Sequence, residues 1–136
     1  MSDGFEFDLI VIGAGTGGNG VARMAAAEGW KVAIVDRLPY GGTCALRGCD
    51  PKKMLVGVTE GVERARAMDG KGLIAEPRID WAEMMAFKRT FTDAMPGRIE
   101  AGHDRAGIAT LQGSARFTAP DTVEIDGRAW RARHFH

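Results

Sequence analysis

The sequence lacks several features that would commit it to common classes of protein. Its 18 basic and 18 acidic residues cancel, so no excess of positive charge favours nucleic acid or an anionic membrane as a partner. It has no basic n-region at its N-terminus and no apolar run long enough to span a bilayer, which points to a cytoplasmic protein. At 136 residues, it is expected to form one domain or a piece of one.

Cysteine and histidine are also scarce. The two cysteines are Cys44 and Cys49, and the three histidines, at 103, 134 and 136, lie far from them in sequence. Because the pair is not C-x-x-C, neither a zinc site nor any other metal site is expected. Cytosolic disulfides are more often catalytic or redox-sensing than structural, which favours a working redox pair. The alternative is two small buried side chains that happen to be close in sequence.

Helix geometry limits how these two cysteines can pair. In an unbroken α-helix, residues five apart have Cα atoms roughly 8–9 Å apart, whereas a disulfide needs Cα atoms closer than about 7 Å. Gly48 and Pro51 are the residue types that break a helix here. Asp50 followed by Pro51 predicts an N-cap and the first position of a new helix. Cys49 then lies at a positive helix N-terminus, which favours the thiolate.

The first 36 residues follow the order strand, glycine turn, helix, strand. Residues 7–12 are an apolar run that ends at glycine, as a buried parallel strand would. Residues 13–18 fit G-x-G-x-x-G, residues 21–28 predict a helix that Gly29 stops, and residues 31–36 predict a second strand. Such a crossover is almost always right-handed.

Each glycine of this turn has its own expected role. Gly13 permits a tight turn, Gly15 lets a pyrophosphate approach the backbone, and Gly18 lets the helix pack close to the strand. The phosphates then lie at the helix N-terminus. Asp36, at the end of the second strand, is placed to accept a hydrogen bond from a ribose hydroxyl. These features predict a dinucleotide site, although they do not by themselves distinguish FAD from NAD.

Together with Asp36 and residues 13–18, the stretch GGTCALRGCDPKK at 41–53 resembles the flavoprotein disulfide reductases, or class I pyridine nucleotide–disulfide oxidoreductases. The resemblance covers essentially the whole chain and is strongest to glutathione reductase. It implies an α/β fold, a Rossmann-like FAD-binding domain with a parallel sheet. It also implies FAD as cofactor and NAD(P)H as co-substrate. Electrons would pass through FAD to a Cys44–Cys49 disulfide and on to a small disulfide such as glutathione disulfide.

The resemblance also assigns roles to residues. Cys44 resembles the interchange thiol that meets the substrate, and Cys49 resembles the thiol that stacks against the flavin. The residues that fall where the family contacts FAD are Gly13, Gly15, Thr16, Gly17, Gly18, Asp36, Thr43, Cys44, Lys52, Lys53 and the backbone near Ala115.

Three features of the sequence are compared with the usual pattern of this family. The family usually has glutamate where this chain has Asp36, and an apolar residue where it has Asp50. A carboxylate beside Cys49 disfavours its thiolate form, so the reduction potential of the cysteine pair is not carried over from the family. Pro-Lys-Lys at 51–53 resembles glutathione and trypanothione reductases, whereas dihydrolipoamide dehydrogenases and mercuric reductases, the alternatives within the family, more often have Pro-Ser-Lys.

The rest of the chain predicts helices first and strands after them. A helix is expected from about residue 51 to Met68, and another from 81 to 95 with Asp80 as its N-cap. Pro96 interrupts that helix, which is expected to resume to about residue 106 with His103 in solvent.

Strands are predicted after Gly107. Residues 122–125 and 128–133 predict a hairpin with a two-residue turn at Asp126-Gly127. The arginines at 128, 131 and 133 are expected to form a solvated sheet edge.

Residues 1–136 are therefore expected to be the N-terminal part of an FAD-binding domain, incomplete at its C-terminal end. In the resembled family, a nicotinamide domain and a dimer-interface domain follow. The partner subunit of a homodimer supplies the acid–base histidine, so none of the present histidines is assigned that role. Two other interpretations are a module that holds part of FAD without turnover, and an NAD-binding dehydrogenase domain with incidental cysteines.

Overall fold

The computed structural model describes residues 4–74 and 76–136, which form two compact units. One unit combines the chain up to Gly42 with the chain from Pro96 onward, and the other spans Thr43–Met95. The first contains a six-stranded sheet, and the second is helical. The α/β fold class expected from the sequence is confirmed.

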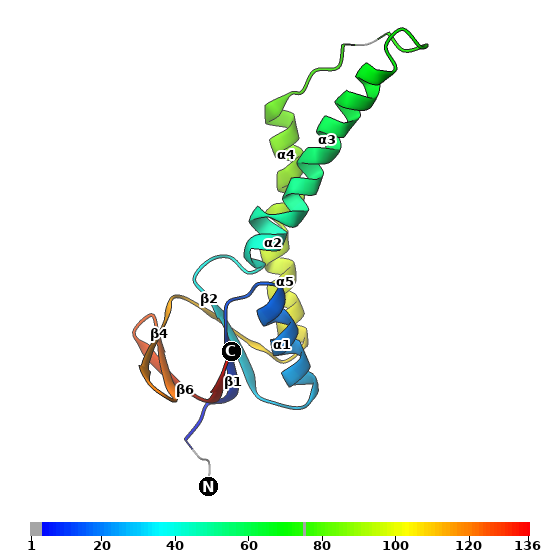
Figure 1. The fold of residues 1–136 in the computed structure, drawn as a ribbon. Coiled ribbons are helices and arrows are strands. Elements are labelled where there is room, and N and C mark those ends of the chain that lie inside the picture. The colour runs from blue at the N-terminus through cyan, green and yellow to red at the C-terminus, as the bar shows by residue number, and fades with distance from the viewer. Residues whose placement is uncertain (1–3, 75) are drawn as a thin grey trace. The chain divides into compact units, whose positions relative to one another are not determined.

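The sheet is part parallel and part antiparallel (Figure 1). Its spatial order is β3-β2-β1-β6-β5-β4. The first four of these are parallel neighbours and the last three are antiparallel. The strands span Phe7–Ile12 (β1), Val32–Asp36 (β2), Ala109–Gln112 (β3), Ala115–Ala119 (β4), Thr122–Ile125 (β5) and Arg128–Phe135 (β6).

Strand β6 joins the two halves of the sheet. Residues 128–131 pair antiparallel with β5, and residues 132–135 pair parallel with β1. The predicted two-residue hairpin turn is confirmed, with φ of 48° at Asp126 and 80° at Gly127. The predicted solvated edge is wrong, because β6 lies between β1 and β5. Two of its arginines contact carboxylates, Arg131 with Asp121 and Arg133 with Asp8, and Arg128 is exposed and lies over the Trp130 ring.

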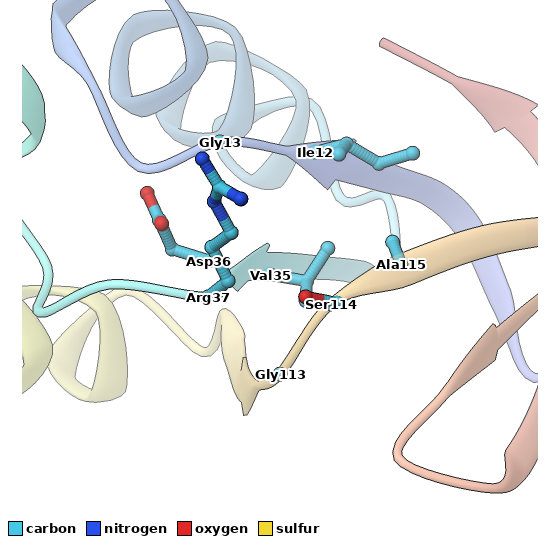
Figure 2. A pocket seen from close by; sticks show the side chains of 8 residues that line it. All are labelled: Ile12, Gly13, Val35, Asp36, Arg37, Gly113, Ser114 and Ala115. Atoms are coloured by element: carbon cyan, nitrogen blue, oxygen red, sulfur yellow. The ribbon is translucent and has the colours of Figure 1, made fainter.

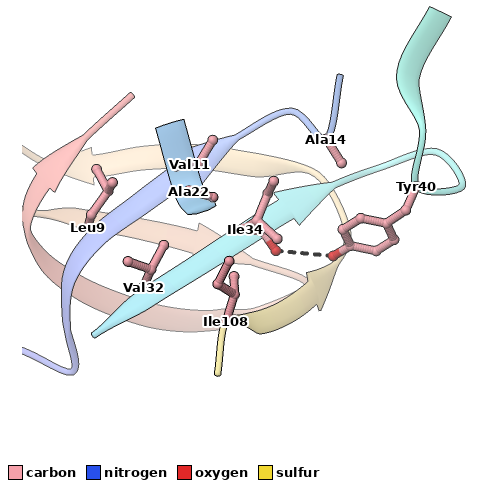
Figure 3. Close-up of a cluster of buried hydrophobic side chains, with 8 residues drawn as sticks. All are labelled: Leu9, Val11, Ala14, Ala22, Val32, Ile34, Tyr40 and Ile108. Atoms are coloured by element: carbon pink, nitrogen blue, oxygen red, sulfur yellow. Dashed lines mark hydrogen bonds between the residues drawn. The ribbon is translucent and has the colours of Figure 1, made fainter. Parts of the chain in front are cut away.

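Strand β2 and most of β1 are buried on both faces. Residues 32–35 of β2 are each at most 1% exposed, as their unbroken apolar run predicted. One face packs in a cluster with helix α1 (Thr16–Ala27), formed by Leu9, Val11, Ala14, Ala22, Val32, Ile34, Tyr40 and Ile108 (Figure 3). The other face packs in a second cluster of Phe7, Ile10, Ala33, Val35, Val123, Ile125 and Ala132.

In the helical unit, a short helix is followed by two longer ones. Helix α2 spans Gly42–Arg47, α3 spans Cys49–Ala67, and α4 spans Trp81–Thr92 and packs against α3 (Figure 1). The predicted N-cap of α4 is confirmed, because an Asp80 side-chain oxygen accepts from the backbone N–H of Glu83 at 3.0 Å. No helix that the structure describes is both long and apolar enough to cross a membrane.

Three predicted helix boundaries are wrong. Helix α1 begins at Thr16, inside the G-x-G-x-x-G motif, and not at residue 21. Helix α3 begins at Cys49 with Gly48 as N-cap, so Asp50 lies in its first turn and is not the cap. Pro51 fits that turn because its missing N–H has no partner to lose there. The second break falls at residues 93–94, before α5 (Met95–Arg105), so Pro96 lies in the first turn of α5.

Candidate functional site

The glycine turn between β1 and α1 is closely packed at Gly18 and open at Gly15. Gly13 has φ of +109°, a conformation that side-chain-bearing residues rarely adopt. A Cβ added to Gly18 would lie 2.0 Å from the Gly13 carbonyl oxygen, so only glycine allows α1 to lie this close to the strand. Gly15 is the N-cap of α1, and a Cβ there would meet no atom within 4 Å. The loop therefore leaves free space at the N-terminus of α1, where anions bind.

Both carboxylate oxygens of Asp36 accept hydrogen bonds from the backbone. One accepts from the Ala14 N–H at 2.8 Å and the other from the Leu38 N–H at 2.9 Å. Asp36 therefore ties the end of β2 to the glycine turn. Each oxygen still has a second lone pair, so the predicted ribose contact is compatible with this geometry. That contact stays a prediction.

A pocket of about 320 Å³ opens beside these residues (Figure 2). It lies at the carboxyl ends of β1 and β2, where open α/β sheets bind their ligands. It brings together Gly13, Asp36 and Ala115, three positions expected at the cofactor. The complete lining is Ile12, Gly13, Val35, Asp36, Arg37, Gly113, Ser114 and Ala115.

The sequence prediction missed Arg37, Gly113 and Ser114 in this lining. Gly113 has φ of +142°, and a Cβ there would lie 2.7 Å from the Asp126 carboxyl carbon. A glycine within the stretch after Gly107 where strands are predicted was the available signal for a close approach of this kind.

The two cysteines lie on either side of a helix break. Gly48 leaves helical dihedrals, with φ of −132° and ψ of −112°, so the break predicted between the cysteines is confirmed. Cys44 lies in α2 and is half-buried, whereas Cys49 is the first residue of α3 and is exposed. Both are free thiols. The alternative of two buried structural cysteines does not fit an exposed Cys49.

The thiols of Cys44 and Cys49 are close enough to interact. The pKa of Cys44 is raised above its usual value, first by a hydrogen bond with the Cys49 thiol, then by desolvation and the Cys49 charge. The Asp50 carboxylate raises it further. The Cys49 thiol and the acid that follows it therefore both disfavour the thiolate of Cys44.

Comparison with known proteins then decides the family. Residues 7–135 match the family model described as pyridine nucleotide-disulphide oxidoreductase. The chain belongs to this family.

Two glutathione reductases and a dihydrolipoyl dehydrogenase illustrate the similarity. The glutathione reductase of Burkholderia cepacia is 37% identical over 136 residues, which cover 95% of this chain and 29% of that protein. The chloroplastic/mitochondrial glutathione reductase of Pisum sativum is 32% identical, over 96% of this chain and 26% of that protein. The dihydrolipoyl dehydrogenase of Thermus scotoductus is 33% identical, over 95% of this chain and 28% of that protein. The chain thus spans less than a third of the length of these relatives.

FAD and NAD(P)H, the cofactors expected from the sequence, are those that this family uses. Thr16 and Gly17 open α1 beside the glycine turn and are both exposed. Thr43, Lys52 and Lys53 are exposed on α2 and α3 of the helical unit. Their contacts with a cofactor stay predictions from the family resemblance. Within residues 4–74 and 76–136, no group of three or more His, Cys, Asp or Glu side chains could hold a metal ion.

His103 is the clearest correction among the candidate residues. It was expected in solvent, but its side chain is 0% exposed and its Nε2 lies 2.7 Å from Oδ1 of Asn19. It also contacts Tyr40 edge-to-face, with ring centroids 6.2 Å apart. Neither Asn19 nor Tyr40 was among the predicted site residues. A histidine in an otherwise polar segment gives no sequence signal that it is buried.

Proposed function

We propose that the complete protein is an FAD-dependent disulfide reductase that passes electrons from NAD(P)H to the Cys44–Cys49 disulfide and on to a small disulfide such as glutathione disulfide. The observation that carries this proposal is the pair of free thiols on either side of the helix break at Gly48, one in α2 and one at the start of α3. Membership of the pyridine nucleotide-disulphide oxidoreductase family supports it.

The residues around the glycine turn fit FAD. The open space at Gly15 and the first amides of α1 suit a pyrophosphate, because the N–H groups of a helix N-terminus point toward a bound anion. Asp36 and Ala115 line the adjoining pocket, which suits the ribose and adenine end. When bound, FAD supplies a route for two electrons from the nicotinamide to a disulfide.

The thiol chemistry belongs to Cys44 and Cys49. The Cys44 thiolate attacks one sulfur of the substrate disulfide, which forms a mixed disulfide and releases the first product thiolate. Cys49 then attacks the Cys44 sulfur, which re-forms the Cys44–Cys49 disulfide and releases the second. The two product thiolates take up the two protons that Cys44 and Cys49 lose. Hydride from NAD(P)H, which carries two electrons and one proton, together with one proton from solvent, would then return the pair to the dithiol form.

Glutathione disulfide is the preferred substrate in this proposal. Pro51, Lys52 and Lys53 match the glutathione reductase pattern, and a glutathione reductase is 37% identical to the chain. The alternative is a dihydrolipoamide dehydrogenase or mercuric reductase activity; the dihydrolipoyl dehydrogenase of Thermus scotoductus is 33% identical. A homodimer and a cytoplasmic location, expected from the sequence, are further parts of the proposal.

The test is an assay of the complete protein with FAD, in which NADPH or NADH oxidation is followed with glutathione disulfide, lipoamide or Hg²⁺. We expect turnover with glutathione disulfide, and loss of turnover in both Cys44→Ser and Cys49→Ser with flavin content retained. Gly15→Val is expected to abolish flavin binding, because its side chain fills the space for the pyrophosphate. Undiminished turnover in the double cysteine variant would refute the redox role, and full flavin content in Gly15→Val would refute the cofactor site.

A further inference from the structure

A hydrogen-bonded polar pair, the half-buried Asn19 and the buried His103, lies next to the glycine turn and has no role in the thiol chemistry. The Asn19 side-chain amide donates to the Ala14 carbonyl at 3.0 Å, and its oxygen lies 2.7 Å from His103 Nε2. The two residues are 84 positions apart, one on α1 and the other on α5. His103 is 0% exposed. Burying a polar ring in this way is favourable only if its hydrogen bond is made.

The contact with Ala14 fixes the orientation of Asn19 and, through it, the protonation of His103. The carbonyl of Ala14 only accepts, so Asn19 must turn its NH₂ group toward it and its oxygen toward the ring. His103 must then carry its hydrogen on Nε2. Its Nδ1 is buried and has no hydrogen-bond partner among the described residues. Burial, and then the positive charge of Arg23, lower the pKa of His103 and so keep this neutral tautomer at neutral pH.

Three hydrogen bonds fix the backbone of Ala14. Its N–H donates to Asp36 at 2.8 Å, and its carbonyl accepts both from Asn19 and from the backbone N–H of Gly41 at 3.2 Å. Ala14 lies between Gly13 and Gly15, the two residues that shape the start of the loop. Because glycines have wide backbone freedom, hydrogen bonds to the residue between them decide which conformation the loop keeps.

We propose that His103 is a positioning residue for the dinucleotide loop: through Asn19 it fixes the Ala14 peptide and so presents Gly15 and the first amides of α1 to the pyrophosphate of FAD. This inference rests on the proposed FAD function. Tyr40 packs against the same ring. Its single hydroxyl hydrogen is within reach of two backbone carbonyls, that of Leu111 at 2.8 Å and that of Ile34 at 3.1 Å, the second of which Figure 3 shows. The His103 ring is thereby held between Asn19 of α1 and Tyr40, which follows β2. This packing fixes the position of the ring relative to the glycine turn.

The experiment compares His103→Leu, His103→Gln and Val123→Ala in the complete protein. Leucine fills the site without a donor, whereas the glutamine amide can still donate to Asn19. Val123→Ala removes buried volume from the second cluster, which contains no residue of the loop or of α1, and is the control for a general loss of stability. Loss of the hydrogen bond between His103 and Asn19 is expected to weaken FAD binding about three- to tenfold in His103→Leu. We expect His103→Gln to bind within about twofold of the wild type, and Val123→Ala to keep its FAD affinity.

A second measurement does not depend on FAD. In the apoprotein, hydrogen exchange at the amides of residues 14–18 should be faster in His103→Leu but unchanged in Val123→Ala. The nitrogen chemical shifts of the wild-type ring should show hydrogen on Nε2 alone. If His103→Leu does not fold, Asn19→Ser tests the same link, because serine is too short to reach both partners.

The outcomes separate the positioning role of His103 from the proposed FAD function. Wild-type FAD affinity and exchange in His103→Leu and Asn19→Ser would overturn the positioning role. Glutamine performing no better than leucine would do the same, because it would reduce the role of the ring to packing. If the wild type itself binds no FAD, the proposed function fails, and the exchange measurement still tests whether His103 holds the loop.

Discussion

At the scale of single residues, Gly18 is the most tightly enclosed position of the dinucleotide loop. A Cβ at this residue would lie 2.0 Å from the Gly13 carbonyl oxygen and 3.0 Å from Val11 Cγ1. Gly18→Ala should therefore push α1 away from β1 and lower the free energy of unfolding by about 1–3 kcal/mol in urea titrations. Gly20→Ala, on the same helix with no atom within 4 Å, should raise it by about 0.5–1 kcal/mol. Equal effects of the two substitutions would contradict the close contact.

Cys44 also allows a prediction at the residue scale. The causes of its raised pKa are headed by the hydrogen bond with Cys49, and Asp50 contributes less. Removing either one should lower this pKa, so the thiolate should form at a lower pH. The pH profile of Cys44 alkylation by iodoacetamide, read from its peptide in the reduced apoprotein, should shift to lower pH in both variants. The shift should be larger in Cys49→Ala than in Asp50→Asn. A profile unchanged in Cys49→Ala would show that the two thiols do not interact.

The residues whose roles could be predicted from the sequence are those with local causes. Gly13 and Gly48 were identified because backbone conformation near a turn or a helix break depends on neighbours in the chain. His103 was assigned to solvent because its burial depends on Asn19, 84 positions away. Asp36 was expected to contact the cofactor, which stays a prediction, and its hydrogen bonds to the backbone of Ala14 and Leu38 were not foreseen.

At the scale of elements, type was easier to predict than boundaries. The apolar runs of β1 and β2 and the hairpin of β5 and β6 follow directly from residue pattern and turn chemistry. The start of α3 was placed too late, because Asp50 and Pro51 fit a first helical turn as well as they fit a cap. A cap is decided by the dihedrals of one residue, here Gly48, and the sequence does not determine them.

The break between α2 and α3 yields a prediction for the redox pair. A Cβ on Gly48 would lie 2.9 Å from the Thr43 carbonyl oxygen, so Gly48→Ala must shift the backbone between the cysteines. Since a disulfide needs close Cα atoms, the equilibrium between dithiol and disulfide should move toward the dithiol, on the order of fivefold, in dithiothreitol buffers of fixed ratio. Gly57→Ala, inside α3 with no atom within 4 Å, should leave the equilibrium unchanged. An unchanged equilibrium in Gly48→Ala would mean that the break is not what brings the thiols together.

At the scale of the whole molecule, the first and last strands of the described chain pair with each other in the middle of the sheet. Near its start, Glu6 donates its backbone N–H to Arg131 at 3.0 Å, and its side chain accepts the N–H of Arg131 at 2.7 Å. Residues 132–135 then pair with β1. No local pattern predicts a pairing across more than 120 positions, and β6 was therefore placed at an edge. Its double pairing makes the parallel and antiparallel halves share one core cluster.

Ala132 lies where β6 changes partner, and it tests whether the two halves unfold together. It is 0% exposed and pairs with Phe7 of β1, in a cluster that also contains Val35 of the parallel half and Val123 of the antiparallel half. A leucine here overfills the cluster, so Ala132→Leu should lower the free energy of unfolding by about 1–3 kcal/mol. Native-state hydrogen exchange should show the same loss of protection at the amides of Val35 and Val123, because both depend on one core. Ala129→Leu, at an exposed position on the same strand, is the control and should change neither amide. Loss of protection confined to Val123 would show that the antiparallel half opens separately and that β6 does not couple the two.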